Sequence, residues 1–191
     1  MRKLFFIVFL TVICVTRFFA ADPDSVNAPK RYQRLDLSYS FAEQVYNNNM
    51  VYNPGLAVSA SYGLMLNESV SLGLGMGYTA LQEERFIPVF FETMGYIRHK
   101  PSTPVILMQV GYSFGWHTGI PDMEGYKFRG GIYIDAGMGR KININKHYSV
   151  FFHVSYRHQF ARMEYEVFGG QLFKDDLNYD MLLISLGLIR H

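Results

Sequence analysis

The sequence predicts an all-β protein, an eight-stranded antiparallel up-and-down transmembrane β-barrel, and three observations support this prediction. Eight stretches alternate apolar residues with small or polar ones, which is the period-two pattern of strands whose two faces meet different surroundings. The connections between these stretches are alternately shorter and longer. A leader of the secretory type precedes them.

The first residues have the pattern of a signal peptide. Arg2 and Lys3 form a positively charged start, residues 4–16 are apolar, and Ala21 ends a small-residue pair suited to cleavage. This run is shorter than the about 20 residues of a membrane helix, and an uncleaved anchor is the alternative because Arg17 interrupts the pattern. We therefore expect three segments: a signal peptide at 1–21, an N-terminal periplasmic segment at 22–33 and a β-barrel at 34–191.

Composition excludes several classes of function. The single cysteine lies in the leader, so the mature chain has no disulfide and no cysteine-based zinc site. Loss of Arg2, Lys3 and Arg17 lowers the 18 Lys and Arg residues to 15, against 16 Asp and Glu, so no basic excess indicates nucleic-acid binding. No cofactor is indicated. After the leader, no stretch resembles a membrane helix, so a membrane-spanning chain must cross with strands.

The first four predicted strands are 34–45, 56–66, 69–79 and 86–98. The first places apolar residues at every second position from Leu35 to Phe41, and the second does so from Leu56 onward. The third is the clearest, because Ser, Gly or Thr separates each apolar residue from the next. The fourth is less regular: Pro88 cannot donate a ladder hydrogen bond, which predicts a bulge or the start of the strand there.

The last four predicted strands are 105–116, 130–142, 148–162 and 181–190. Each again places Leu, Ile, Val, Met or an aromatic residue at alternate positions, as in the run from Leu182 to Leu188. Strands of about ten tilted residues match the thickness of a bilayer's hydrocarbon core. Aromatic residues near the outer strand ends suit a membrane girdle, although aromatics also favour strands in general.

The composition of the less apolar face distinguishes a membrane barrel from a soluble barrel of the lipocalin type, whose strands also alternate apolar and polar residues. These positions carry mainly Gly, Ser and Ala, which suit the crowded interior of a small barrel better than a water-facing exterior. The apolar face is therefore expected to meet lipid, with both termini in the periplasm. The short connections are then 67–68, 99–103 and 143–147, and the outer ones are 47–54, 117–127, 164–179 and the shorter 81–85.

Two motifs carry a family resemblance that covers the chain from Arg34 to its end. Segment 85–91 looks like an Ile-Pro strand opening, and Gly73, Gly75 and Gly77 alternate with apolar residues. The chain thus resembles the small outer-membrane β-barrels with an eight-stranded, OmpA- or OmpX-like domain, especially the porin-like family common in Bacteroidota. This resemblance implies a place in the bacterial outer membrane, contact with its lipid and lipopolysaccharide, and delivery by the barrel assembly machinery. The ending in His191 departs from the terminal aromatic that this machinery often reads.

A set of polar residues is expected to point into the lumen. Turns near Lys146 and Lys100 would place Asp135 opposite Arg157 and Glu92 opposite Gln109. Because unpaired charges are costly to bury, we expect a salt-bridged plug, with the selectivity ring of a narrow pore as the alternative. The lumen candidates are Glu92, Gln109, Asp135, His153, Arg157 and Gln159 at mid-depth, and Asp36 and Lys141 nearer the periplasmic end.

Other residues allow further hypotheses. His153 and Ser155 suggest a hydrolase similar to the lipid-A deacylases, but their position in the alternation turns both inward, away from lipid. The acidic loop 164–179 could bind calcium or bridge to lipopolysaccharide phosphates, yet it matches no EF-hand spacing, so no metal site is predicted. Candidates for contact with host or envelope proteins, or for a cap, are Trp116, His117, Tyr126 and Phe128.

We therefore predict a non-enzymatic protein that serves envelope structure, or adhesion and recognition through its outer loops. The second hypothesis is a narrow porin-like channel for ions or small solutes, for which a conducting lumen would be the evidence. The third is an outer-membrane lipid-modifying enzyme, for which loss of lipid modification on His153→Ala would be the evidence.

Overall fold

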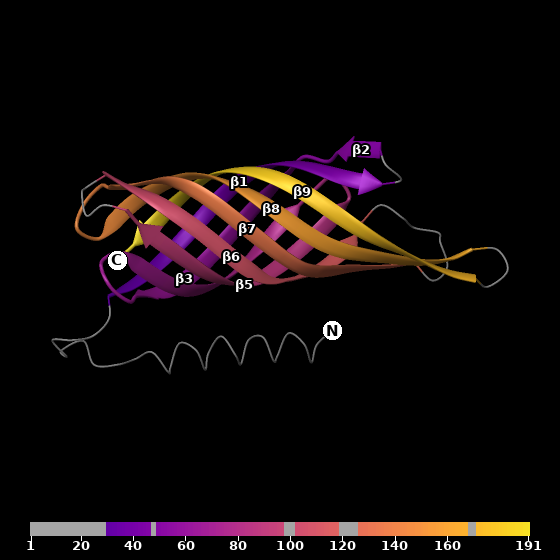
Figure 1. Cartoon of the computed structure of the whole chain (residues 1–191), viewed down its shortest axis with the longest axis horizontal. Coiled ribbons are helices and arrows are strands. Elements are labelled where there is room, and N and C mark those ends of the chain that lie inside the picture. Colours follow the sequence, from indigo (N-terminus) through magenta and orange to yellow (C-terminus); the bar gives the residue numbers. More distant parts are fainter. Residues whose placement is uncertain (1–29, 47–48, 98–101, 119–125, 168–170) are drawn as a thin grey trace.

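The computed structural model describes residues 30–46, 49–97, 102–118, 126–167 and 171–191, so the expected signal peptide lies outside the described residues. Eight long antiparallel strands close into a barrel through the pairing of the first with the last, which confirms the predicted fold class (Figure 1). The barrel strands are β1 (Arg31–Tyr46), β3 (Gly55–Met65), β4 (Val70–Ala80), β5 (Glu84–Tyr96), β6 (Ser102–His117), β7 (Lys127–Asn143), β8 (Tyr148–Val167) and β9 (Gln171–Arg190). A short strand, β2 (Asn49–Tyr52), pairs with one end of β1.

The strands follow one another around the barrel in chain order. We call the end where β1 begins and β9 finishes the inner end, and the opposite end the outer end; in register, Gln33 faces Arg190 at the former and Val45 faces Asn178 at the latter. β1 begins at Arg31, three residues before the predicted start of the barrel. Pro88 lies inside β5 opposite Ser113, and the register on either side of it is unchanged, so the expected bulge is not at this residue.

The predicted loop 164–179 is mostly strand. β8 and β9 are each 20 residues long and stay paired from Tyr148↔Arg190 to Val167↔Gln171. Their hairpin reaches well past the rest of the barrel at the outer end (Figure 1). The many charged residues of this segment predict a loop. A two-stranded ribbon exposed to water on both faces, however, tolerates charged residues and can pair them across its strands.

The outward face of the barrel is a belt of large apolar side chains. Leu37 is 60%, Phe91 68% and Met138 71% exposed, and residues of this kind occupy alternate positions of every barrel strand. Charged outward residues bound the belt, among them Arg162 at the outer end and Arg140 at the inner end. This confirms the predicted lipid-facing side, because such a surface is stable only against hydrocarbon.

No helix in the described parts of the chain is long and apolar enough to cross a membrane.

The inward face is packed around large side chains that glycines make room for. A Cβ atom on Gly75 would lie 2.4 Å from the Phe90 ring, and one on Gly73 would lie 2.5 Å from the Tyr32 hydroxyl. Phe90 and Tyr32 are almost fully buried inside the barrel. The alternating glycines of β4 therefore let inward aromatic residues of β5 and β1 fill the lumen.

Candidate functional site

The centre of the lumen is a hydrogen-bonded network around the Glu92 carboxylate of β5. Its Oε2 accepts hydrogen bonds from Arg34 Nη2 at 2.6 Å and Gln109 Nε2 at 2.9 Å. Its Oε1 accepts from Ser61 Oγ at 2.9 Å and from the Tyr32 hydroxyl at 3.0 Å. Glu92 lies opposite Gln109, as the turn position predicted. Because four donors from three other strands, β1, β3 and β6, converge on it, this carboxylate ties much of the barrel wall together.

Arg34 is the cation of this network, and sequence reasoning missed it. Besides contacting Glu92, its Nε lies 2.7 Å from Asp36 Oδ2, and its guanidinium carbon is 5.6 Å from the centre of the Phe151 ring. Both members of the Arg34–Asp36 pair are buried. The signal is present in the alternation, since Tyr32, Arg34 and Asp36 share one face of β1, but the predicted strand begins at Arg34, so its side chain is not among the predicted lumen residues.

A second pair lies on β7 and β8. Arg157 Nε is 2.9 Å from Asp135 Oδ2, and the two residues face each other in register, which confirms the predicted pairing. The Arg157 guanidinium also lies over the Tyr133 ring, 4.9 Å from its centre. Nearby, Ser113 Oγ donates to Gln159 Oε1 at 2.7 Å. The charged groups that the sequence placed at mid-depth are thus paired rather than free to bind a passing ion.

The residues of the hydrolase hypothesis also lie in the lumen. His153 and Ser155 are 4% and 3% exposed, and the His153 ring stacks on Phe151 with centres 4.6 Å apart. Neither side chain can reach a lipid outside the barrel, as their place in the alternation predicted. Lys141, also predicted to face inward, lies nearer the inner end with its Nζ 4.9 Å from the centre of the Tyr96 ring.

An apolar cluster caps the lumen at the outer end. It packs Phe86, Phe128 and Tyr179 together, with ring centres 5.6 Å apart in both the Phe86–Phe128 and Phe86–Tyr179 pairs. The Glu84 carboxylate fixes one side of it, accepting from Asn53 Nδ2 at 2.7 Å and from the Tyr179 hydroxyl at 3.2 Å. This cap covers the polar network on the side away from the start of β1 and the end of β9.

Three of the four predicted loop candidates belong to this cap. Phe128 is buried in it, Tyr126 packs against it, and the His117 ring lies edge-on to both, 6.3 and 5.7 Å away. Burial and the nearby carboxylates of Glu84 and Glu83 raise the pKa of Tyr126 to about 12. Trp116 is the exception: it faces outward beside Tyr78, with ring centres 6.2 Å apart.

A second apolar cluster closes the inner end. Its members are buried residues of five strands that meet below the polar network: Tyr32, Met94, Tyr96, Val105, Leu107, Phe151 and Ile189. Buried side chains therefore occupy the lumen in three layers, apolar, polar and apolar. The charged pairs of the middle layer are covered on both sides.

Comparisons with known proteins agree with this architecture. The solved structure of Neisserial surface protein A is similar with a TM-score of 0.58 and 9% sequence identity, over 84% of this chain and 96% of that one. The outer membrane protein OprG from Pseudomonas aeruginosa is similar with a TM-score of 0.56 and 9% identity, over 85% of this chain and 95% of that one. This chain has the fold of the small outer-membrane β-barrels. No protein-family profile and no curated protein sequence matches it.

The hairpin of β8 and β9 is the barrel's most prominent outer feature, and sequence reasoning missed it. Tyr165 and Phe173 stack across its strands with ring centres 5.9 Å apart, while Leu172 and Phe173 remain 53% and 45% exposed. Two of its acidic residues pair with basic ones: Asp176 with Arg162 at 2.7 Å, and Glu164 with Arg129 and Lys174 at 3.7 and 3.9 Å. Among the described residues, no group of three or more His, Cys, Asp or Glu side chains is arranged to hold a metal ion.

The hairpin also carries an open strand edge. β9 pairs with β1 as far as Asn178, and beyond that residue its described part, 171–177, is paired on the β8 side alone. An unpaired strand edge offers a row of backbone donors and acceptors to another chain. The alternation of residues 171–180 was masked by their acidic composition, which is why the sequence did not reveal this edge.

Proposed function

We propose that the protein is a non-enzymatic barrel of the bacterial outer membrane, exported with a signal peptide, that holds the β8–β9 hairpin above the membrane to bind another protein. Host proteins and other envelope proteins are the two partner classes. One observation carries the proposal: the lumen is packed with side chains, while the hairpin exposes apolar side chains and an unpaired edge.

The hairpin has the two features that strand addition requires. The free edge of β9 can pair with an extended segment of a partner, so that main-chain hydrogen bonds supply affinity. The exposed Leu172 and Phe173 beside this edge can contact alternate side chains of the added strand. Recognition of this kind uses the rigid barrel as a platform and places the contact surface outside the membrane.

The packed lumen speaks against the two other hypotheses. A channel would require the outer and inner apolar clusters to open together, because each covers the polar layer. A lipid-modifying enzyme based on His153 would require lipid to enter the lumen, where His153 and Ser155 are buried. Adhesion or recognition by the outer hairpin requires neither change.

The test is surface expression in a non-adherent bacterial host, followed by binding to immobilised host-cell proteins and to envelope preparations. We expect the hairpin variant L172N/F173N to lose binding that the unchanged protein shows. The matched control is L66N/I144N, which replaces two exposed apolar residues, 59% and 62% exposed, beside the inner turns. No binding by the unchanged protein, or equal loss in both variants, would overturn the proposal.

A further inference from the structure

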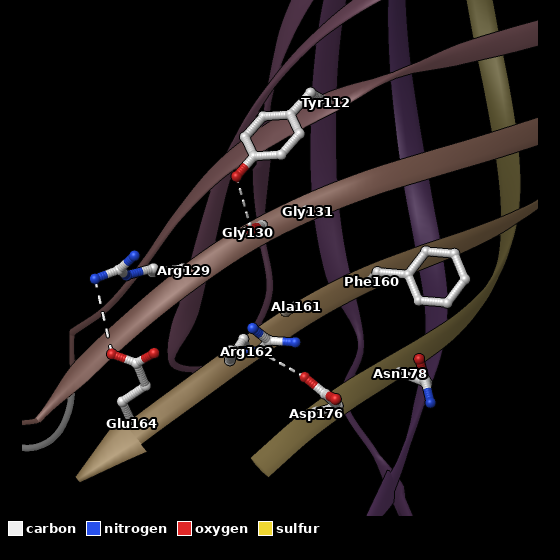
Figure 2. A pocket seen from close by; sticks show the side chains of 10 residues that line it. All are labelled: Tyr112, Arg129, Gly130, Gly131, Phe160, Ala161, Arg162, Glu164, Asp176 and Asn178. Carbon is white, nitrogen blue, oxygen red and sulfur yellow. Dashed lines mark hydrogen bonds and ion pairs between the residues drawn. The ribbon is translucent and has the colours of Figure 1, made fainter. Parts of the chain in front are cut away.

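A groove on the outer surface of the barrel has the features of a binding site for a charged amphipathic molecule. It lies across β7, β8 and β9, has a volume of about 540 Å³, and is outside the lumen (Figure 2). Phe160 and Tyr112 form its apolar side, next to the lipid-facing belt. Arg129, Arg162 and the acidic residues Glu164 and Asp176 form its polar side.

Two arginines lie opposite each other in register at this groove. Arg129 of β7 and Arg162 of β8 are register partners, so their side chains leave adjacent strands on the same outward face. Like charges placed directly opposite each other destabilise a strand pair. The arrangement becomes favourable when an anion lies between the two guanidinium groups, because each can form paired hydrogen bonds with phosphate oxygens.

A bulge in β7 creates this arrangement. The register of β7 against β8 shifts between Gly130 and Tyr133, so one extra residue is inserted there. Phe128 and Tyr133 both point inward, and Arg129 and Ile132 both point outward, which strict alternation does not allow. The bulge therefore turns Arg129 to the outside without disturbing the lumen residues that follow. The Tyr112 hydroxyl donates to the Gly130 carbonyl at 3.2 Å, and this bond holds the floor of the groove (Figure 2).

The arginines have carboxylate partners that an anion can replace. Arg162 Nε is 2.7 Å from Asp176 Oδ1, with both side chains largely exposed, and Arg129 Nη2 is 3.7 Å from Glu164 Oε2 (Figure 2). The exposed Arg162–Asp176 pair contributes little to stability. The Arg129 side chain is 61% exposed and its contact with the mostly buried Glu164 is long, so both arginines can turn to a phosphate at small cost. The carboxylates and the Asn178 amide then remain beside the ligand as hydrogen-bond partners for hydroxyl groups.

From these contacts we propose that the groove binds the phosphorylated sugar headgroup of an outer-leaflet glycolipid of the lipid A type. Arg129 and Arg162 hold the phosphate, and the acyl chains run down the belt past Phe160 and Tyr112. Glu164 and Asp176 accept hydrogen bonds from the sugar hydroxyls, and the Asn178 amide can accept or donate them. The inference rests on the outer-membrane location in the proposed function, but on neither the hairpin's partner nor the lumen. A glycolipid of the lipid A type fits because its headgroup lies at the level where the apolar belt ends.

The test is native mass spectrometry of the refolded mature chain released from detergent micelles, with phosphorylated lipid A as the probe. We expect a complex with one bound lipid, and R129A/R162A should weaken it by at least about tenfold, because charge-assisted hydrogen bonds are lost. R129K/R162K keeps the charge but loses the paired geometry, so it should fall between the two. The control R140A/R190A removes two outward arginines from the inner end and should bind like the unchanged protein.

Other probes identify which part of the lipid is recognised. Dephosphorylated lipid A should bind at least about tenfold more weakly, and inorganic phosphate alone should not compete at equal concentration. Equal binding of dephosphorylated lipid A would overturn the phosphate clamp, and competition by free phosphate would overturn the lipid part. Equal effects of the outer and inner arginine variants would overturn the site. Heat-modifiable gel mobility verifies that each variant is folded, so a failure here is distinct from a failure of hairpin recognition.

Discussion

Replacement of Glu92 by Ala should be among the most damaging single changes in the lumen. Glu92 is 2% exposed and accepts hydrogen bonds from Tyr32, Arg34, Ser61 and Gln109. Its loss leaves the buried Arg34 with one carboxylate partner and three neutral donors without their acceptor. Breaking a buried ion pair by removing one partner costs about 3–5 kcal/mol. We therefore expect E92A to lower the free energy of unfolding by about 4 kcal/mol.

The assay is urea unfolding of the refolded barrel in lipid vesicles, followed by fluorescence. Trp116 is the single tryptophan of the chain and faces lipid at the outer end, so its emission reports the loss of the barrel. With a slope of about 2 kcal/mol per molar urea, the midpoint should fall by about 2 M. The control E43A removes an exposed outward carboxylate and should change the free energy by less than about 0.5 kcal/mol.

A double variant tests the cause of this loss. If the cost of E92A comes from an uncompensated Arg34 charge, then R34M/E92A should be less destabilised than the sum of the two single variants. A midpoint shift in E92A no larger than that of E43A would refute the reasoning. Strict additivity of R34M and E92A would refute it as well, because it would mean that the two groups do not depend on each other.

Three further outcomes are expected. In planar bilayers the unchanged protein and R157A should both be silent, because the two apolar clusters remain when that charge is removed; stable conductance steps in either would contradict a closed lumen. G75A should lose about 1–3 kcal/mol of stability, since its Cβ would lie 2.4 Å from the Phe90 ring, whereas G95A meets nothing within 4 Å and serves as the neutral comparison in the same urea assay. Tyr126 should ionise near pH 12, as the absorbance difference between the unchanged protein and Y126F would show. Because this pKa is raised on folding, its contribution to stability is present below about pH 10 and is lost as the pH rises to 12; ionisation near pH 10 would contradict the burial of Tyr126.

Most of the lumen residues could be predicted from the sequence because side chains along a strand alternate between its two faces with a period of two. Once the inward face is chosen, parity alone places Asp135, His153 and Arg157 inside, and a turn position sets the residue opposite each one. The pairs Glu92–Gln109 and Asp135–Arg157 were found in this way. Arg34 was missed because the start of a strand is less certain than its middle, although its parity was correct.

The outer end was harder to predict, because there the apolar signal of the membrane disappears. Residues 164–179 carry charges on both faces, so period-two alternation of apolarity no longer marks a strand, and the β8–β9 ribbon looked like a loop. The bulge between Gly130 and Tyr133 was also missed, since Phe128 and Ile132 continue one period-two alternation in the sequence although they point to opposite faces in the structure. The first error arises where water meets both faces of the ribbon, and the second where two consecutive glycines carry no apolar signal.

The sequence by itself determined the barrel, its strand number, its lipid-facing side and the inward charges, because all of these follow from the alternation of side chains along single strands. Only the tertiary structure decided that Arg34 and Glu92 meet, that Tyr126, Phe128 and His117 cap the lumen, and that Arg129 lies opposite Arg162 beside a groove. These contacts depend on the shear of the closed barrel and on a local bulge, which bring together residues from strands that are not adjacent or shift them by one position. Neither the shear nor the bulge can be predicted from the composition or the side-chain period of a single strand.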